Sequence, residues 1–342
     1  MKHTISFFLL VLSGFIGFSQ SNASRIDLVK KTVIGGDGSW DYLFASVDDR
    51  RLYLSHGSQV EVINADTHEK IGVISNSAGI HGVCAIPALN KGYITNGKTN
   101  QVTVFDIKTL QPVLVIPAGK NPDALLYDKF SNKVFIFNND DESITIIDAA
   151  TDKVIQTIDT GGNPEAGVTN DEGMIYVNLE DTNEIIAISS KTLVVNSRFK
   201  LFPGEQPTGL ALDKKARRLF STCRKSELMI VLDAKTGEVL AQLPIGKGVD
   251  GVIFDDQSKL AICSNGDGTL TVVKEFSMNK FEVIDTIQTA RGAKTLTFDN
   301  KTNRIFTVTA QLGETPAPTS ENPKPKPYIV PGTFMVLEYG KK

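Results

Sequence analysis

Carboxylate, imidazole and amine side chains recur at one position of a short turn that is repeated along the chain. The turn has a Gly-x-x-Pro-like pattern and is clearest at Gly119–Ala124. The residues at the equivalent position are Asp41, His81, Asp123, Glu165, Thr208, Asp250 and Lys294. If these turns converge, their carboxylates could hold a divalent cation, because hard cations take several oxygen ligands. Alternatively, each carboxylate accepts hydrogen bonds from backbone amides of its own or the next turn, which is the usual role of Asp in turns.

A second set of polar residues follows another strand of the repeat and includes His56 and Arg224. His56 and His81 could share a metal ion or an acid–base role, since imidazole titrates near neutral pH. They could equally be two unrelated loop histidines. Arg224 and Lys294 could bind an anion, or they could neutralise the carboxylates.

The spacing of these residues reflects an internal repeat. Pro122 and Pro164 are 42 residues apart, and Pro164 and Pro207 are 43 residues apart. A fixed period of this size indicates a repeat architecture. In each unit the turn leads to a short apolar strand, an Asp- or Asn-containing tight turn, a strand rich in β-branched residues, and two further strands. The fourth strand alternates apolar and polar residues, which is typical of a half-exposed strand.

Seven copies of the third strand set the number of units. They lie at Val60–Asn64, Val102–Asp106, Ile144–Asp148, Ile185–Ser189, Met229–Asp233, Leu270–Lys274 and Phe334–Glu338. Seven four-stranded units predict an all-β fold, a seven-bladed β-propeller, over residues 26–342. The last unit lacks a fourth strand, and Ile26–Ile34 has the strand character to supply it. Such closure removes the sheet edges that the alternative, an open β-solenoid, would leave exposed.

In a propeller, the turns between blades and the loops after each second strand lie on one face, around the central channel. The two sets of candidate residues are therefore expected to converge there, together with Trp40, the only tryptophan, and Tyr328. The predicted ligand-binding residues of this channel face are Asp41, His56, His81, Asp123, Glu165, Arg224, Asp250, Lys294, Trp40 and Tyr328. A divalent cation at the channel mouth is the one cofactor that this set suggests.

Residues 311–332 interrupt the seventh unit and contain six prolines. So many prolines oppose strand pairing and favour an extended polyproline path. Because long loops inside compact domains commonly serve function, we expect an ordered lid or rim. A flexible decoration is the alternative.

The strand Gly92–Asn96, which reads Gly-Tyr-Ile-Thr-Asn, has weaker copies at Met174–Asn178 and Arg304–Thr309. These strands, together with the repeated turn, resemble the YVTN-type repeat of exported bacterial β-propellers, the YncE-like family. The tail segments Glu314–Thr319 and Pro323–Pro327 resemble one branch of that family. The resemblance covers nearly all of the chain after its first residues and implies the propeller fold. It implies no particular activity, because propellers host many functions.

The first residues have the pattern of an export signal. Lys2 precedes an apolar run, Ile5–Phe18, that is too short for a comfortable membrane span. We therefore predict a signal peptide over residues 1–19, cleavage near residues 19–23, and a periplasmic or secreted protein without a membrane span.

The formal net charge is −3, and the chain has no basic block, so nucleic acid is an unfavourable partner. A monomer is expected. The three cysteines leave at least one thiol free: Cys223 and Cys263 could form a bridge, or all three could be small buried hydrophobic residues.

The sequence contains no Walker loop, no H-E-x-x-H motif and no G-x-S-x-G motif. The expected function is therefore that of a binding or scaffold protein which recognises a small-molecule ligand or a protein partner on its channel face. The alternative is an enzyme, either a lactonase-like hydrolase or a quinone-cofactor-type dehydrogenase, since similar propellers support such chemistry. That enzyme would use the acidic and histidine residues at the channel mouth.

Overall fold

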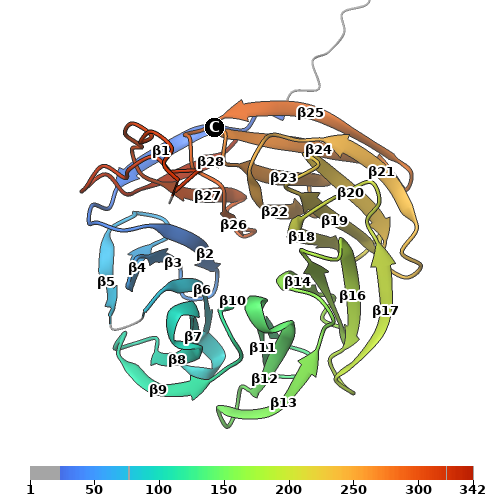
Figure 1. Ribbon diagram of the computed structural model, residues 1–342, viewed down its shortest axis with the longest axis horizontal. Helices are drawn as coiled ribbons and strands as arrows, with labels where there is room; N and C mark the ends of the chain where they lie inside the picture. Colours follow the sequence, from blue (N-terminus) through green and yellow to red (C-terminus); the bar gives the residue numbers. More distant parts are fainter. Residues whose placement is uncertain (1–23, 76–77, 321, 342) are drawn as a thin grey trace, which may run out of the picture.

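The computed structural model describes residues 24–75, 78–320 and 322–341. They form seven four-stranded antiparallel sheets arranged as blades around a central channel (Figure 1). The predicted seven-bladed β-propeller is thereby confirmed. The predicted signal peptide lies outside the described residues. Within those residues, no helix has the length and apolar character needed to cross a membrane.

The strands follow one another from the channel outward in blades 1 to 6. Blades 1 to 3 consist of β2 (Trp40–Ser46), β3 (Arg51–His56), β4 (Gln59–Asn64) and β5 (Lys70–Ile74); β6 (Ile80–Ile86), β7 (Lys91–Asn96), β8 (Gln101–Asp106) and β9 (Pro112–Pro117); and β10 (Pro122–Asp128), β11 (Lys133–Asn138), β12 (Ser143–Asp148) and β13 (Lys153–Asp159). Blades 4 to 6 consist of β14 (Pro164–Thr169), β15 (Met174–Leu179), β16 (Glu184–Ser189) and β17 (Val194–Lys200); β18 (Pro207–Asp213), β19 (Arg218–Cys223), β20 (Leu228–Asp233) and β21 (Val239–Pro244); and β22 (Val249–Asp255), β23 (Leu260–Asn265), β24 (Thr269–Ser277) and β25 (Lys280–Gln288). Three short 3-10 turns are η1 (Pro87–Leu89), η2 (Gly97–Thr99) and η3 (Asn139–Asp141).

Blade 7 is built from both ends of the described chain. Its sheet order is β1 (Asp27–Val33), β28 (Met335–Gly340), β27 (Arg304–Thr309) and β26 (Leu296–Asp299). The N-terminal strand β1 pairs antiparallel with β28, so Val33 lies opposite Met335 (Figure 1). This arrangement confirms the predicted ring closure, because β28 is paired with β1 on one edge and with β27 on the other.

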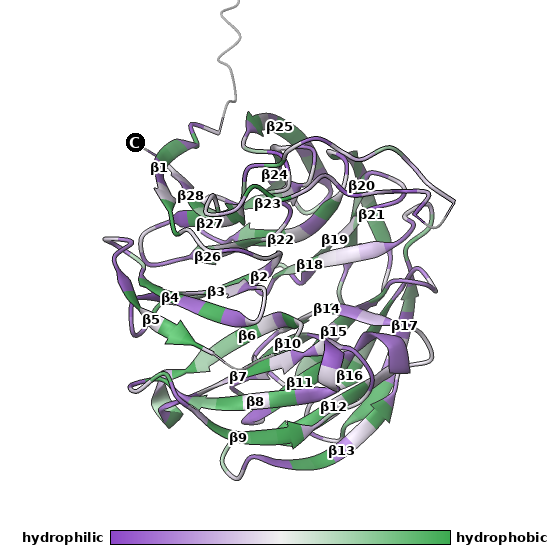
Figure 2. Cartoon of the chain, turned by 60° about the vertical axis from the view of Figure 1, so that its left-hand side comes forward, coloured by the Kyte–Doolittle hydropathy of each residue, from purple (hydrophilic) through white to green (hydrophobic). Residues whose placement is uncertain are grey.

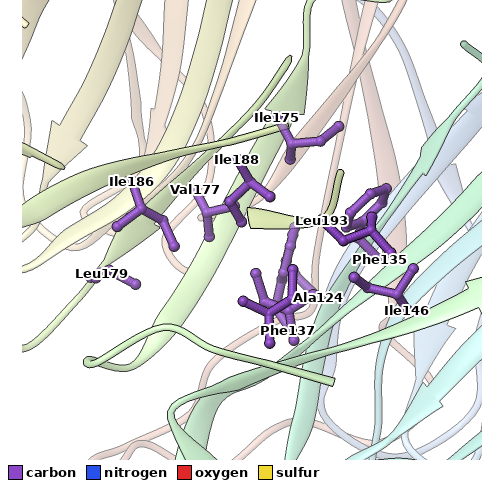
Figure 3. Packing of buried hydrophobic residues seen from close by; sticks show 12 residues of the cluster. Ala124, Phe135, Phe137, Ile146, Ile175, Val177, Leu179, Ile186, Ile188 and Leu193 are labelled. Atoms are coloured by element: carbon purple, nitrogen blue, oxygen red, sulfur yellow. The ribbon is translucent and has the colours of Figure 1, made fainter. Parts of the chain in front are cut away.

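The core lies in layers between neighbouring blades. Figure 3 shows one such layer, in which Phe135 and Phe137 of blade 3 pack against Ile175 and Val177 of blade 4. These side chains are fully buried, because the second and third strands of each blade are covered on both faces. Apolar β-branched and aromatic residues therefore fill both faces of those strands.

Four of the seven first strands end in the Asp of a tight turn, as predicted: Asp128, Asp213, Asp255 and Asp299. Asp213 accepts hydrogen bonds from the backbone amides of Lys215 and Ala216 at 2.9 Å, and Asp299 accepts one from Lys301 at 3.0 Å. Each carboxylate thereby replaces a backbone acceptor in the turn and fixes where the second strand begins.

The outermost strands differ from the predicted alternation. In β9, three consecutive residues, Val113, Leu114 and Val115, are exposed, and only Ile116 is buried. Figure 2 shows this strand and its neighbour β13 largely in the hydrophobic colour. Because most residues of these outer strands are exposed, burial does not enforce alternation on them.

The proline-rich insertion, residues 311–332, is anchored at its base. Leu312 and Ile329 form an isolated antiparallel bridge, and the amide of Val330 donates to the carbonyl of Gln311 at 2.9 Å. The expectation that prolines oppose pairing holds for the outer part of the insertion and is wrong at its base. The amide of Gly332 also donates to the carbonyl of Gly36 at 3.0 Å, which fixes the insertion beside the turn that leads into blade 1.

All three cysteines are buried free thiols: Cys84, Cys223 and Cys263. The conceivable bridge between Cys223 and Cys263 is not formed. Burial raises the pKa of each thiol to about 12, which suppresses the reactive thiolate.

Candidate functional site

The register of the innermost strands places the candidate residues at the channel mouth. In blades 1 to 6 the candidate is the second residue of the first strand, for example Asp41 in β2 and His81 in β6. In blades 1 to 6, the turn that leads into the blade is hydrogen-bonded to the loop after the second strand of the same blade. The amide of Gly57 donates to Ser39 at 2.7 Å in blade 1, and the amide of Gly97 donates to Gly79 at 2.8 Å in blade 2. Both predicted loop sets therefore share one face.

Three of the candidate side chains meet one another. His81 Nδ1 lies 2.7 Å from Asp41 Oδ2 and 3.0 Å from Asp123 Oδ1, and each residue comes from a different blade. One potential ligand atom from each of the three lies within 4.8 Å of the other two. The side chain of His81 is 30% exposed, that of Asp41 is 18% exposed and that of Asp123 is 15% exposed, so solvent reaches the cluster.

A second group of ring residues forms an ion-pair network. Asp250 is buried and accepts from both Arg224 and Lys294. Lys294 Nζ also lies 3.3 Å from Asp41 Oδ1, which joins this network to the histidine cluster. Arg224 and Lys294 both contact Asp250. This geometry agrees with the alternative in which the two cations neutralise carboxylates.

Glu165 is a buried carboxylate of the ring, with 7% of the residue exposed. The Asn139 side-chain amide donates to it at 3.0 Å. Burial and the charges of Asp123 and Asp250 raise the pKa of Glu165 well above its usual range. In the described part of the chain, Asp41, Asp123, Glu165 and Asp250 accept from side chains and not from backbone amides. The turn-capping alternative is therefore wrong for these four residues.

Electrostatics separates the two carboxylates that contact His81. Burial alone would raise the pKa of Asp41, but the hydrogen bond with His81 and the nearby Lys294 hold it below its usual range. Burial and the charge of Asp41 raise the pKa of Asp123 to about 7. Burial opposes the charged imidazole, yet the hydrogen bond to Asp41 and the charge of Asp123 raise the pKa of His81. The three groups thus hold a proton at neutral pH that isolated carboxyl groups would have lost.

Sequence reasoning missed Tyr42, which follows the ring position in blade 1. The residues at the same place in the other blades are small: Gly82, Ala124, Ala166, Gly209, Gly251 and Thr295. Tyr42 packs against the core cluster of blades 3 and 4, so its side chain crosses the channel from blade 1. Beneath the ring, the channel narrows to a cavity of about 190 Å³ lined by these residues.

The Tyr42 hydroxyl lies in the field of the ring. Burial and the charges of Glu165 and Asp123 raise the pKa of Tyr42 well above its usual range, so the phenol remains protonated. The signal that could have identified Tyr42 is its size, because a single large residue replaces glycine, alanine or threonine in a sevenfold pattern.

Three predicted residues do not join the ring. His56 is 1% exposed and stacks on Phe334 with ring centroids 4.0 Å apart, at the interface of blades 1 and 7. Trp40 donates its indole N–H to the carbonyl of Gly292 at 3.0 Å. Tyr328 is 56% exposed in the insertion. The hypothesis that His56 and His81 share a metal ion has no support in this geometry.

An open cavity of about 830 Å³ lies beside the histidine cluster, on the same face. It crosses blades 1 to 3 and is lined alternately by inter-blade turns and by loops after second strands. Its lining residues are Gly38, Ser39, Gly57, Ser58, Ala78, Gly79, Ile80, His81, Gly97, Lys98, Asn100, Lys120, Asn121 and Asp140. Gly57 and Gly79 have φ values of 63° and 65°, which glycine adopts without strain, and their lack of side chains keeps the cavity open. We call this space the blade 1–3 cavity.

On the opposite face, a separate cavity of about 480 Å³ lies over the tight turns of blades 5 to 7. Phe254 and Phe298 are among its lining residues, and Lys214 and Lys215 lie at its edge. No predicted site residue lines it.

The closed ring of seven antiparallel blades, with a polar channel mouth, defines the class of the protein as a seven-bladed β-propeller. Residues 29–173, which include most of β1, the first three blades and the first strand of blade 4, match the family model of the YNCE-like beta-propeller. The resemblance predicted from the repeated strands is thereby confirmed. No curated protein matches the chain.

Proposed function

We propose that this propeller is a binding protein that holds a small-molecule ligand in the blade 1–3 cavity. The observation that carries this proposal is the cavity itself, whose volume of about 830 Å³ lies in the range of about 300–1,000 Å³ typical of ligand sites. It opens on the channel face, where the rigid blades fix the positions of all lining loops. A rigid site loses little conformational entropy when a ligand binds.

The lining chemistry indicates the kind of ligand. The amide side chains of Asn100 and Asn121 offer donors and acceptors within one space. The ammonium groups of Lys98 and Lys120 add positive charge at the cavity wall, against one lining carboxylate, Asp140. A polar molecule with an anionic group fits this lining better than an apolar one.

The proposal is tested by extraction of bound molecules. Tag-free protein is incubated with a small-molecule extract of the source cells, separated from unbound material and denatured, and the released compounds are identified by mass spectrometry. Ser58 lines the cavity and is exposed, so Ser58→Trp should fill the cavity and abolish enrichment. Ser277, an exposed residue of the β24–β25 hairpin, provides the control Ser277→Trp, which should retain enrichment.

The outcomes separate the binding classes. Enrichment that is equal in both tryptophan variants contradicts a ligand site in this cavity. A protein partner captured on the channel face and released by Ser58→Trp, without any enriched small molecule, would replace the ligand by a scaffold role. Export and a monomeric state complete the proposal. Secretion of a reporter fused to residues 1–23 tests the first, and light scattering of the purified protein tests the second.

An enzymatic role is the second candidate, and one observation favours it. Asp123 and Glu165 both have raised pKa values at the channel mouth, and perturbed acids cluster at catalytic sites more often than elsewhere. A hydrolase of this kind should open lactones with a pH–rate profile that Glu165→Gln alters. Equal rates with and without the protein across a lactone series and a quinone-cofactor series would exclude these two activities.

A further inference from the structure

We propose that Asp41, His81 and Asp123 bind one divalent transition-metal ion of the zinc class at the channel mouth. The three residues come from β2, β6 and β10, so each ligand is positioned by its own blade. The structure thus places one imidazole nitrogen and two carboxylate oxygens around a single point.

The distances suit a metal ion. Around a tetrahedral ion with bonds of about 2.0–2.2 Å, neighbouring ligand atoms lie about 3.3–3.6 Å apart. His81 Nδ1 is 2.7 Å from Asp41 Oδ2 and 3.0 Å from Asp123 Oδ1. Lengthening of these two separations by roughly 0.3–0.9 Å would therefore make room for the ion.

The hydrogen-bond inventory of the cluster favours a bound cation. His81 Nδ1 can carry one proton, yet two carboxylate oxygens approach it within hydrogen-bond distance. In the described part of the chain, the Asp123 carboxylate has no donor other than this shared nitrogen. A metal ion would satisfy both carboxylates and the nitrogen lone pair at once, which one proton cannot do.

The surroundings preserve this arrangement. Gly97 allows the imidazole to lie against the backbone, because a Cβ at that position would approach His81 Nε2 to 2.7 Å and Asn121 Oδ1 to 2.5 Å. Lys294 lies 3.3 Å from Asp41 Oδ1, whereas the proposed ligand atom is the other oxygen, Oδ2. Lys294 can therefore keep its contact with Asp250 while the ion is bound.

The donor set selects among metal ions. Imidazole nitrogen is a preferred ligand of Zn²⁺ and similar first-row ions, whereas Ca²⁺ and Mg²⁺ take oxygen ligands. The remaining ring carboxylates are engaged elsewhere, Glu165 by Asn139 and Asp250 by Arg224 and Lys294. The ring as a whole is thus unsuited to Ca²⁺. His81 lines the blade 1–3 cavity, so coordination positions of the ion would face open space.

The test is calorimetric titration of tag-free, chelator-treated protein with Zn²⁺, with Ca²⁺ and Mg²⁺ titrated separately. We expect one Zn²⁺ per chain and no comparable binding of Ca²⁺ or Mg²⁺. Asp41→Asn, His81→Gln and Asp123→Asn should each weaken Zn²⁺ binding by more than the roughly 10- to 100-fold that loss of a supporting contact costs. Asp123→His, which supplies a different ligand atom, should retain binding.

Glu165→Gln is the matched control, because it removes a ring carboxylate outside the ligand set. Urea midpoints of all variants show which of them are folded. Absence of stoichiometric Zn²⁺ binding, or an equal loss of binding in Glu165→Gln and the folded ligand variants, overturns the proposal. The titration uses the metal ion alone, so its failure leaves the small-molecule proposal standing, and the reverse also holds.

Discussion

The network around Asp250 gives the sharpest prediction about stability. This buried carboxylate accepts from both Arg224 and Lys294, so Asp250→Ala leaves two cations without their main partner. Breaking a buried ion pair costs about 3–5 kcal/mol. Arg224 and Lys294 are 33% and 37% exposed, and each keeps a second carboxylate, Glu180 at 3.5 Å and Asp41 at 3.3 Å. Partial hydration and these contacts reduce the expected loss to roughly 2–3 kcal/mol.

Asp256 offers a matched control, because it also contacts two cations, Lys215 and Lys259. Its side chain is 42% exposed, against 4% for Asp250. Exposed ion pairs contribute about 0–1 kcal/mol, so Asp256→Ala should be close to neutral. The contrast isolates burial, since the number and sign of the partners are the same.

The assay is urea denaturation at pH 7, with the free energy of unfolding obtained by linear extrapolation. Arg224→Leu and Lys294→Met combined with Asp250→Ala should recover part of the loss, because uncharged side chains need no partner. A loss of less than about 1 kcal/mol in Asp250→Ala, or equal losses in both Asp variants, would refute the reasoning.

Three further predictions concern the channel, the ring and the thiols. Tyr42→Ala should lower the free energy of unfolding by roughly 2–4 kcal/mol, somewhat less than truncation of a fully buried aromatic residue. A crystal structure of this variant should show a channel cavity larger than about 190 Å³. An unchanged urea midpoint would contradict the packing role of Tyr42. The pKa of Glu165 is raised in the folded state, so folding takes up a proton and stability should fall as pH rises above about 4.5. Glu165→Gln should flatten this dependence in urea titrations between roughly pH 5 and pH 8. A parallel decline in stability of both proteins would argue against a role of Glu165 in this pH dependence. The three buried cysteines should resist a thiol reagent in buffer and all react in denaturant, whereas rapid labelling of the native protein would contradict their burial.

Much of the fold could be predicted because the repeat fixes several independent features at once. Asp residues such as Asp213 mark the ends of four of the seven first strands, and the strand character of Ile26–Ile34 reveals the closing strand. The exposed residues Val113–Val115 could not be predicted, because an outer strand that is largely exposed has no buried face to impose a pattern.

The candidate site could be predicted only in part. Equivalent positions in the repeat place Asp41, His81 and Asp123 on one face, but they do not show which side chains touch. Contact depends on side-chain direction and on distances across the channel, which the repeat does not specify. His56 illustrates the limit, since its place at the end of β3 directs it onto Phe334, away from the cluster.

The most direct test of the account is a crystal structure of the protein purified from its source cells without added ligand. The account predicts non-protein density in the blade 1–3 cavity, bounded by Gly57, Gly79 and Gly97 and in contact with His81 or with an ion bound to it. Solvent alone in that cavity, with density instead in the opposite cavity beside Phe254 and Phe298, would contradict it.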